Sequence, residues 1–132
     1  MTALDERTAE ALAAVDRIVA DFANHRRDAY FAGFAPDATF LFHTAPHRLE
    51  SRVAYEQLWD DWERQNGFRV TACTSSNRRI QLFQDLAVFS HDVETVVEID
   101  GVTQTLVECE SIVLEHRGGA WLCVHEHLSQ RT

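Results

Sequence analysis

Three residues in the second half of the chain, His91, Glu110 and His127, have the side chains that acid–base chemistry requires. An imidazole and a carboxylate in a region of low dielectric constant fix each other's protonation state, and one of them can then act as a general acid or base near neutral pH. Two imidazoles and one carboxylate are also the smallest ligand set for zinc or non-haem iron. Both kinds of chemistry depend on whether the three side chains meet.

Their meeting depends on four segments that we predict to be strands of an antiparallel meander, at residues 69–83, 86–99, 102–117 and 120–129. The segments are separated by the pairs Gln84-Asp85, Asp100-Gly101 and Gly118-Gly119. The last two pairs are strong hairpin signals, because two-residue turns need positive φ angles that Gly and Asp tolerate. Tight turns fix the register, and they predict Glu110 opposite His91 on one side and His127 on the other.

The predicted row of His91, Glu110 and His127 lies on the more apolar face of the sheet, which should curve around the helices. Polar groups that converge inside an apolar concavity are typical of a ligand site. If Gln84-Asp85 is also a tight turn, Arg78 joins the row. We also predict Phe89, Glu108 and His125 as ligand-binding residues; the apolar part of this face is Phe89, Val93, Val97, Leu106, Ile112, Leu114, Trp121 and Cys123.

Several roles are open to the row. The three side chains can simply satisfy one another's hydrogen bonds in the interior, orient a ligand, or catalyse a reaction, in which case His91, Glu110 and His127 are the catalytic residues. We predict no metal and no cofactor, because cross-strand neighbours ordinarily hydrogen-bond each other.

The first half of the sequence predicts helices at residues 4–27 and 28–34, a strand at 38–44 that ends before Pro46, and a short return arm at 47–50. Ser51 is a good N-cap and Gly67 a good C-terminal stop for a helix at 52–66. Pro36 should end the second helix. Side chains from these elements are predicted to complete the ligand site: Tyr30, His43, Trp59 and Trp62.

Length and composition predict one folded domain over residues 1–132, since 45% of the residues are hydrophobic and 25% are charged. The formal net charge of -9 disfavours nucleic acid and anionic membranes as partners. The polar start and the absence of a long apolar run predict neither a signal peptide nor a membrane anchor, and hence a cytoplasmic protein. Cys73, Cys109 and Cys123 are predicted to be reduced core residues.

The opposite face of the predicted sheet is too apolar for open water, and contiguous exposed apolar area usually marks an interface. We therefore predict a homodimer that packs through this outer face. Its predicted members are Val88, Val96, Val107, Val113, Leu122, Val124 and Leu128, beside Glu94, Glu98 and Glu126.

Nearly the whole chain resembles the nuclear transport factor 2-like superfamily, particularly its SnoaL-like branch. The stretches FAPDATFLFH (34–43) and GGAWLCVHEHLS (118–129) carry this likeness. The closing stretch is also similar to the association domain of calcium/calmodulin-dependent protein kinase II, as are AYEQLW (54–59) and EIDG (98–101). The resemblance implies an α+β fold in which a curved antiparallel sheet wraps around the N-terminal helices, a cone-shaped, cystatin-like α+β barrel with an internal cavity and dimerisation through the sheet.

The resemblance also bears on activity. Arginines line the pocket of the association domain, whereas Glu94 and Leu128 occupy two of those positions here. The catalytic aspartate and the helix tyrosine of ketosteroid isomerases correspond to Phe42 and to a position near Ile18. Three functions stay open: a small-molecule-binding homodimer, a cofactor-independent lyase, isomerase or cyclase that uses a His/Glu pair on a small hydrophobic substrate, and a pure assembly domain.

Overall fold

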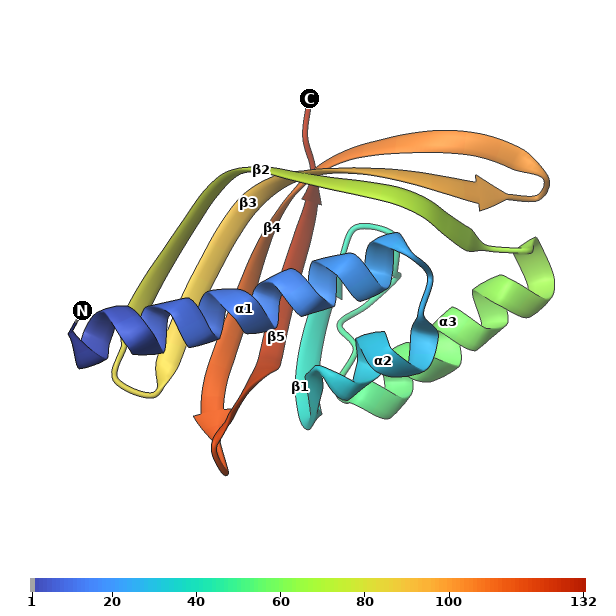
Figure 1. Ribbon diagram of the computed structural model, residues 1–132. Helices are drawn as coiled ribbons and strands as arrows, with labels where there is room; N and C mark the ends of the chain where they lie inside the picture. The colour runs from blue at the N-terminus through green and yellow to red at the C-terminus, as the bar shows by residue number, and fades with distance from the viewer. Residues whose placement is uncertain (1) are drawn as a thin grey trace.

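The protein is described by a computed structural model that covers residues 2–132, so Met1 of the predicted domain lies outside the described residues. Helices come first and strands last, which confirms the predicted α+β class (Figure 1). The elements in chain order are α1 (Ala3–Ala23), α2 (Arg27–Ala32), β1 (Phe34–Phe42), α3 (Arg52–Asn66), β2 (Arg69–Phe83), β3 (Leu86–Ile99), β4 (Val102–Arg117) and β5 (Ala120–Gln130).

The five strands form one sheet in the order β1-β5-β4-β3-β2, and the sheet curves over α1 with all three helices on its inner side (Figure 1). β1 runs parallel to β5, whereas the other neighbours are antiparallel. The sheet is therefore mixed, not purely antiparallel. It is also open, since β1 and β2 are its two edges, and it does not close into a barrel.

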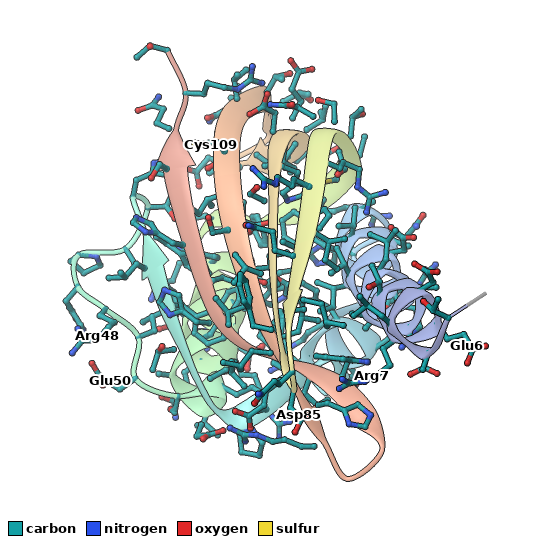
Figure 2. The ribbon with its side chains drawn as sticks, turned by 90° about the vertical axis from the view of Figure 1, so that its left-hand side faces the viewer. Glu6, Arg7, Arg48, Glu50, Asp85 and Cys109 are labelled. Carbon is teal, nitrogen blue, oxygen red and sulfur yellow. The ribbon has the colours of Figure 1, made fainter. Side chains whose placement is uncertain are left out.

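α1 begins at a capping box in which the Thr2 side chain accepts a hydrogen bond from the Asp5 amide at 3.1 Å. Its buried stripe of Ala11, Ala14, Val15 and Ile18 faces the sheet. The helix ends at Ala23, four residues before the predicted end. A salt bridge of 2.9 Å from Arg7 to Asp85 ties its first turns to the β2–β3 turn (Figure 2).

β1 begins at Phe34, four residues earlier than predicted, and contains Pro36. The prediction treated the proline as the end of a helix. An edge strand tolerates a proline because one side of its backbone needs no partner in the sheet. The predicted return arm is present as a single bridge between Phe40 and Leu49.

α3 has the predicted bounds and caps. The Ser51 hydroxyl accepts a hydrogen bond from the Ala54 amide at 3.1 Å, and Gly67 adopts a left-handed conformation with φ of 59°. The amide of Asp100 donates to the carbonyl of Asn66 at 2.7 Å, which joins the end of this helix to the β3–β4 turn. None of the helices within residues 2–132 is both long and apolar enough to cross a lipid bilayer.

The three predicted turns of the meander are present, with Phe83 facing Leu86, Ile99 facing Val102, and Arg117 facing Ala120. β3 and β4 keep one register along their whole length. β4 and β5 do not, because a bulge shifts the register by one residue between the Leu114–Cys123 and Val113–His125 pairs. The extra residue is Val124, which has no partner on β4.

Candidate functional site

The β3–β4 register places Glu110 opposite His91, as predicted. The His91 Nε2 atom lies 2.8 Å from Glu110 Oε1, and its Nδ1 atom lies 2.6 Å from the Ser75 hydroxyl of β2. The His91 side chain is 1% exposed and that of Glu110 is 14% exposed. Both ring nitrogens of His91 are therefore engaged, and its imidazole is held in a fixed orientation in the interior.

His127 does not complete this row. Because side chains alternate between the two faces of a strand, the bulge at Val124 turns every residue that follows it to the face opposite the predicted one. His127 now faces Ser111 and is exposed on the outer side of the sheet, and His125 is hydrogen-bonded there to the Thr39 hydroxyl at 2.8 Å. Glu126 and Leu128, which were predicted on the outer face, point into the interior instead.

Arg78 does not join the row either, and it does not line the cavity. β2 shifts its register between Ser76 and Arg79, so the tight Gln84-Asp85 turn does not carry the predicted pairing as far as His91. The Arg78 guanidinium forms an ion pair with Asp16 of α1 and stacks 5.0 Å from the ring centroid of Phe89.

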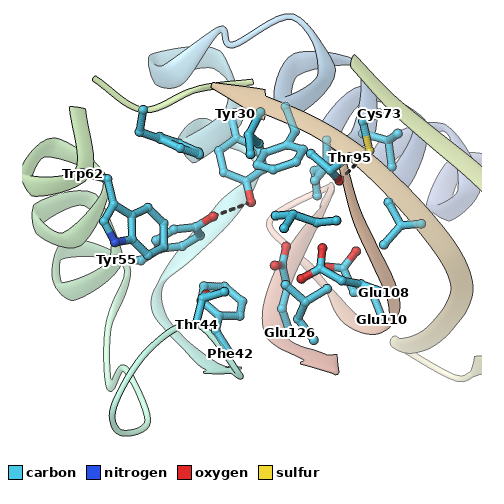
Figure 3. A pocket seen from close by; sticks show the side chains of 18 of the residues that line it. Tyr30, Phe42, Thr44, Tyr55, Trp62, Cys73, Thr95, Glu108, Glu110 and Glu126 are labelled. Atoms are coloured by element: carbon cyan, nitrogen blue, oxygen red, sulfur yellow. Dashed lines mark hydrogen bonds between the residues drawn. The ribbon is translucent and has the colours of Figure 1, made fainter. Parts of the chain in front are cut away.

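A cavity of about 280 Å³ lies between the inner face of the sheet and the helices. Its wall is mainly apolar and aromatic, and its most polar part is a group of glutamates, Glu108, Glu110 and Glu126. Figure 3 shows these carboxyl groups gathered on one side, while Tyr55 and Trp62 of α3 lie on the other. We call Glu108, Glu110 and Glu126 the carboxyl cluster.

The predicted ligand-binding residues divide between this cavity and its surroundings. Tyr30, Trp62 and Glu108 line it, as do His91 and Glu110. Trp59 and Phe89 are fully buried in the core behind the wall. His43 does not line the cavity, but its Nε2 atom pairs with the Glu108 carboxylate and therefore supports the wall from outside.

Burial dominates the electrostatics of the carboxyl cluster. Glu126 is 2% exposed, and burial, the nearby charge of Glu110 and a hydrogen bond with that carboxyl group raise the pKa of Glu126 well above the usual range. Burial also raises the pKa of Glu108, against the opposing effect of its contact with His43. Glu126 is thus a neutral acid under conditions in which an exposed glutamate is ionised.

Two tyrosines face each other in the same cavity. The hydroxyl groups of Tyr30 and Tyr55 are 3.0 Å apart, and both side chains are buried (Figure 3). Burial raises the pKa of both phenols well above their ordinary value. The pair therefore stays neutral: one hydroxyl group donates to the other, and the second hydroxyl proton is left for a ligand.

The cysteines differ in their surroundings. Cys123 is buried in the core, and Cys73 lines the cavity with its pKa raised by burial to about 11. Cys109 was predicted to be a core residue, but it is exposed on β4, because position 109 points away from the helices (Figure 2). All three are free thiols.

The residues do not assemble into a metal centre. Within residues 2–132, no group of three or more His, Cys, Asp or Glu side chains is placed to hold a metal ion. The ligand set that the predicted row offered is lost because His127 turns outward.

The prediction missed Glu126, Tyr55 and Thr95 as lining residues. Tyr55 could have been found, since it lies one helical turn before Trp59 on α3 and shares its buried stripe. Thr95 could also have been found, because it lies on the inner face of β3 between Val93 and Val97. Glu126 could not, since its orientation depends on the bulge.

The fold and the cavity together define an α+β domain whose curved sheet encloses an interior space against its helices. The chain belongs to the SnoaL-like domain family, whose model matches residues 11–132. This match confirms the predicted resemblance to the SnoaL-like branch. No curated protein matches the sequence at a significant level.

Solved structures share the architecture. A ketosteroid isomerase-like protein from Erwinia carotovora atroseptica is 18% identical, with a TM-score of 0.80 over 97% of this chain and 98% of that one. An NTF2-like protein from Cytophaga hutchinsonii is 14% identical, with a TM-score of 0.78 over 99% and 100%. A protein from Xanthomonas campestris described as a calcium/calmodulin-dependent protein kinase II association domain is 21% identical, with a TM-score of 0.76 over 92% and 86%. Identities this low show the fold alone.

Proposed function

We propose that the protein binds a small molecule inside the cavity, with the apolar body of the ligand against the aromatic wall and its polar end at the carboxyl cluster. The observation that carries this proposal is the buried carboxyl group of Glu126, which faces an open space of about 280 Å³. Burying a carboxyl group is costly, and stability alone would favour an apolar side chain at this position. A volume near the lower end for ligand pockets implies a small ligand.

The experiment is native mass spectrometry of the purified protein, followed by thermal unfolding with a panel of small neutral and charged aromatic compounds. Val93→Phe should fill the cavity, because Val93 lines it and is 5% exposed. We expect this variant to fold and to lose every ligand-induced stabilisation. The control is Val102→Phe at the exposed tip of the β3–β4 hairpin, where Val102 is 57% exposed, and it should keep the stabilisation. Equal responses from both variants would place binding outside the cavity.

A second candidate function is a cofactor-independent lyase, isomerase or cyclase reaction on a small hydrophobic substrate. It is favoured by the 2.8 Å contact between His91 Nε2 and Glu110 Oε1 at the cavity wall, next to the neutral acid Glu126. Glu110 would act as the base and Glu126 as the acid, while His91 orients Glu110. Turnover of a bound compound that Glu110→Gln abolishes while binding persists would support this candidate.

We further propose a homodimer that packs through the outer face of the sheet. The half-buried side chains Val107 and Val113 of β4 and Leu122 and Val124 of β5 lie on that face and give it an apolar surface. Val113→Glu should dissociate the dimer in analytical ultracentrifugation. Val53→Glu on α3, where Val53 is 54% exposed, is the control and should leave the dimer intact. A wild-type monomer at micromolar concentration would contradict the dimer.

A further inference from the structure

We propose that the ligand of this cavity is an organic ammonium, a primary or secondary amine on a small apolar body, and that its cationic group binds at Glu126. This inference rests on the proposed small-molecule binding and names the chemical class of the ligand. It follows from the charges in the wall, from the partners of each carboxyl group and from the aromatic rings opposite them.

The charges in the wall have one sign. Among the described residues, neither lysine nor arginine lines the cavity, whereas three glutamates do. An anionic ligand would therefore find no cation to pair with, and it would lie beside Glu108, Glu110 and Glu126 in a low-dielectric space. The formal net charge of -9 for the whole chain favours the approach of cations as well.

The three carboxyl groups differ in their partners. Glu108 is paired with His43 and Glu110 with His91, so two carboxyl groups of the cluster each have an imidazole. Glu126 is 2% exposed, and within residues 2–132 no histidine or arginine side chain is paired with it. Glu126 is therefore the one carboxyl group of the cluster without a basic partner, and it lines the cavity.

The opposite wall suits a cation too. Six aromatic side chains from the helices, β1 and the α3–β2 connection line the cavity, and a ring face attracts an ammonium group most strongly where water is excluded. A ligand with a carboxylate contact at one end and ring faces around it would be held in one orientation. The six rings belong to Phe22, Tyr30, Phe42, Tyr55, Trp62 and Phe68.

Binding of the ammonium group has a proton consequence. In the empty cavity Glu126 carries a proton, and an ammonium ion placed beside it favours the carboxylate, so the proton leaves to solvent as the ion pair forms. Affinity for the cation should therefore rise with pH until the amine itself loses its proton. The titratable groups that face Glu126 or its neighbours in the cluster are Glu108 and Glu110 on β4, His91 on β3, Cys73 on β2, Tyr30 on α2, Tyr55 on α3, Cys123 on β5 and His43 after β1.

The test is isothermal titration calorimetry with three probes of similar shape: benzylamine, benzyl alcohol and benzoate. The wild type should bind benzylamine about tenfold or more tightly than benzyl alcohol, because a charged hydrogen bond replaces a neutral one, and benzoate should not bind. Glu126→Gln should lower the affinity for benzylamine to that for benzyl alcohol and leave benzyl alcohol unchanged. Glu98→Gln, which removes an exposed carboxylate from β3, should change nothing.

If Glu126→Gln does not fold, the wild-type protein alone can still test whether the ligand is an ammonium ion. Titration of benzylamine at pH 6 in two buffers of different ionisation enthalpy should show close to one proton released per ligand bound, and release of none overturns the inference. Benzyl alcohol that binds as well as benzylamine, and is lost in Val93→Phe, would overturn the ammonium ligand but keep the proposed function. Failure of all three probes overturns the inference, and native mass spectra without any retained ligand would then count against the proposed function as well.

Discussion

The β3–β4 and β4–β5 hairpins of the meander have turns of the same length but differ in which side chains they place in the interior. The β3–β4 ladder keeps one register from its turn to the far end, and His91 meets Glu110. The β4–β5 ladder gains one residue at Val124, and beyond it His127 leaves the interior while Glu126 enters it. One unpaired residue thus exchanges the imidazole of His127 for the carboxyl group of Glu126 in the cavity wall. The predicted row of one carboxylate between two imidazoles becomes a cluster of three glutamates, in which Glu110 keeps its contact with His91.

We expect the largest loss of folding stability when a residue is deleted from a strand whose register is regular. Deletion of Asp92, in the regular part of β3, shifts half of that strand by one residue and moves its buried side chains to the outer face. We expect no cooperative unfolding transition in urea for this variant. Deletion of Val124 removes only the unpaired residue and leaves Glu126 facing inward, so it should fold with a loss of about 1–3 kcal/mol. Equal loss of cooperativity in both variants would mean that the bulge has no special place in the β4–β5 pairing.

Substitutions of His91 and His127 should differ in how much they lower the free energy of unfolding. His91→Leu leaves the buried groups of Ser75 and Glu110 without a partner, and should lower the free energy of unfolding by about 2–3 kcal/mol. His127→Leu on the exposed outer side should change it by no more than about 0.5 kcal/mol. Urea unfolding at pH 7 measures both. Similar losses in the two variants would contradict the placement of His127.

A more gradual effect lies in the pH dependence of stability. The pKa of Glu126 is raised in the folded protein, so between the unfolded pKa and the folded one the native state holds a proton that the unfolded state has lost. The raised pKa of Glu126 therefore makes its full contribution to the free energy of unfolding at low pH. This contribution decreases as the pH rises through that window, by no more than about 1.4 kcal/mol per pH unit. Glu126→Gln should make the stability of the protein fall less steeply between pH 5 and 7 in urea unfolding, whereas Glu98→Gln should not change the slope.

How much the sequence could predict depends on where each feature is encoded. The bounds of α3 follow from Ser51 and Gly67, and the β3–β4 register follows from Asp100 and Gly101, because caps and turns depend on residues at fixed local positions. The bulge has no such signal, since Val124 is an ordinary strand residue. The predicted start of β1 was wrong for a related reason. Only the order of the strands in the sheet reveals that Pro36 lies in an edge strand.

The candidate site shows the same division. Tyr30, Trp62, His91, Glu108 and Glu110 could be placed at the cavity from helical spacing and from one hairpin. Glu126, His125 and His127 could not, since alternation along β5 allows two opposite orientations and the strand pairing chooses between them.

The bulge at Val124 places the carboxyl group of Glu126 in the same cavity wall as that of Glu110. The most direct measurement is a carbon-13 NMR titration of the glutamate side-chain carboxyl groups, with the Glu126 signal assigned by its absence in Glu126→Gln. We predict that Glu126 stays protonated well above the ordinary glutamate pKa of about 4.3. Ionisation of Glu126 near that ordinary value would contradict its placement in the cavity wall.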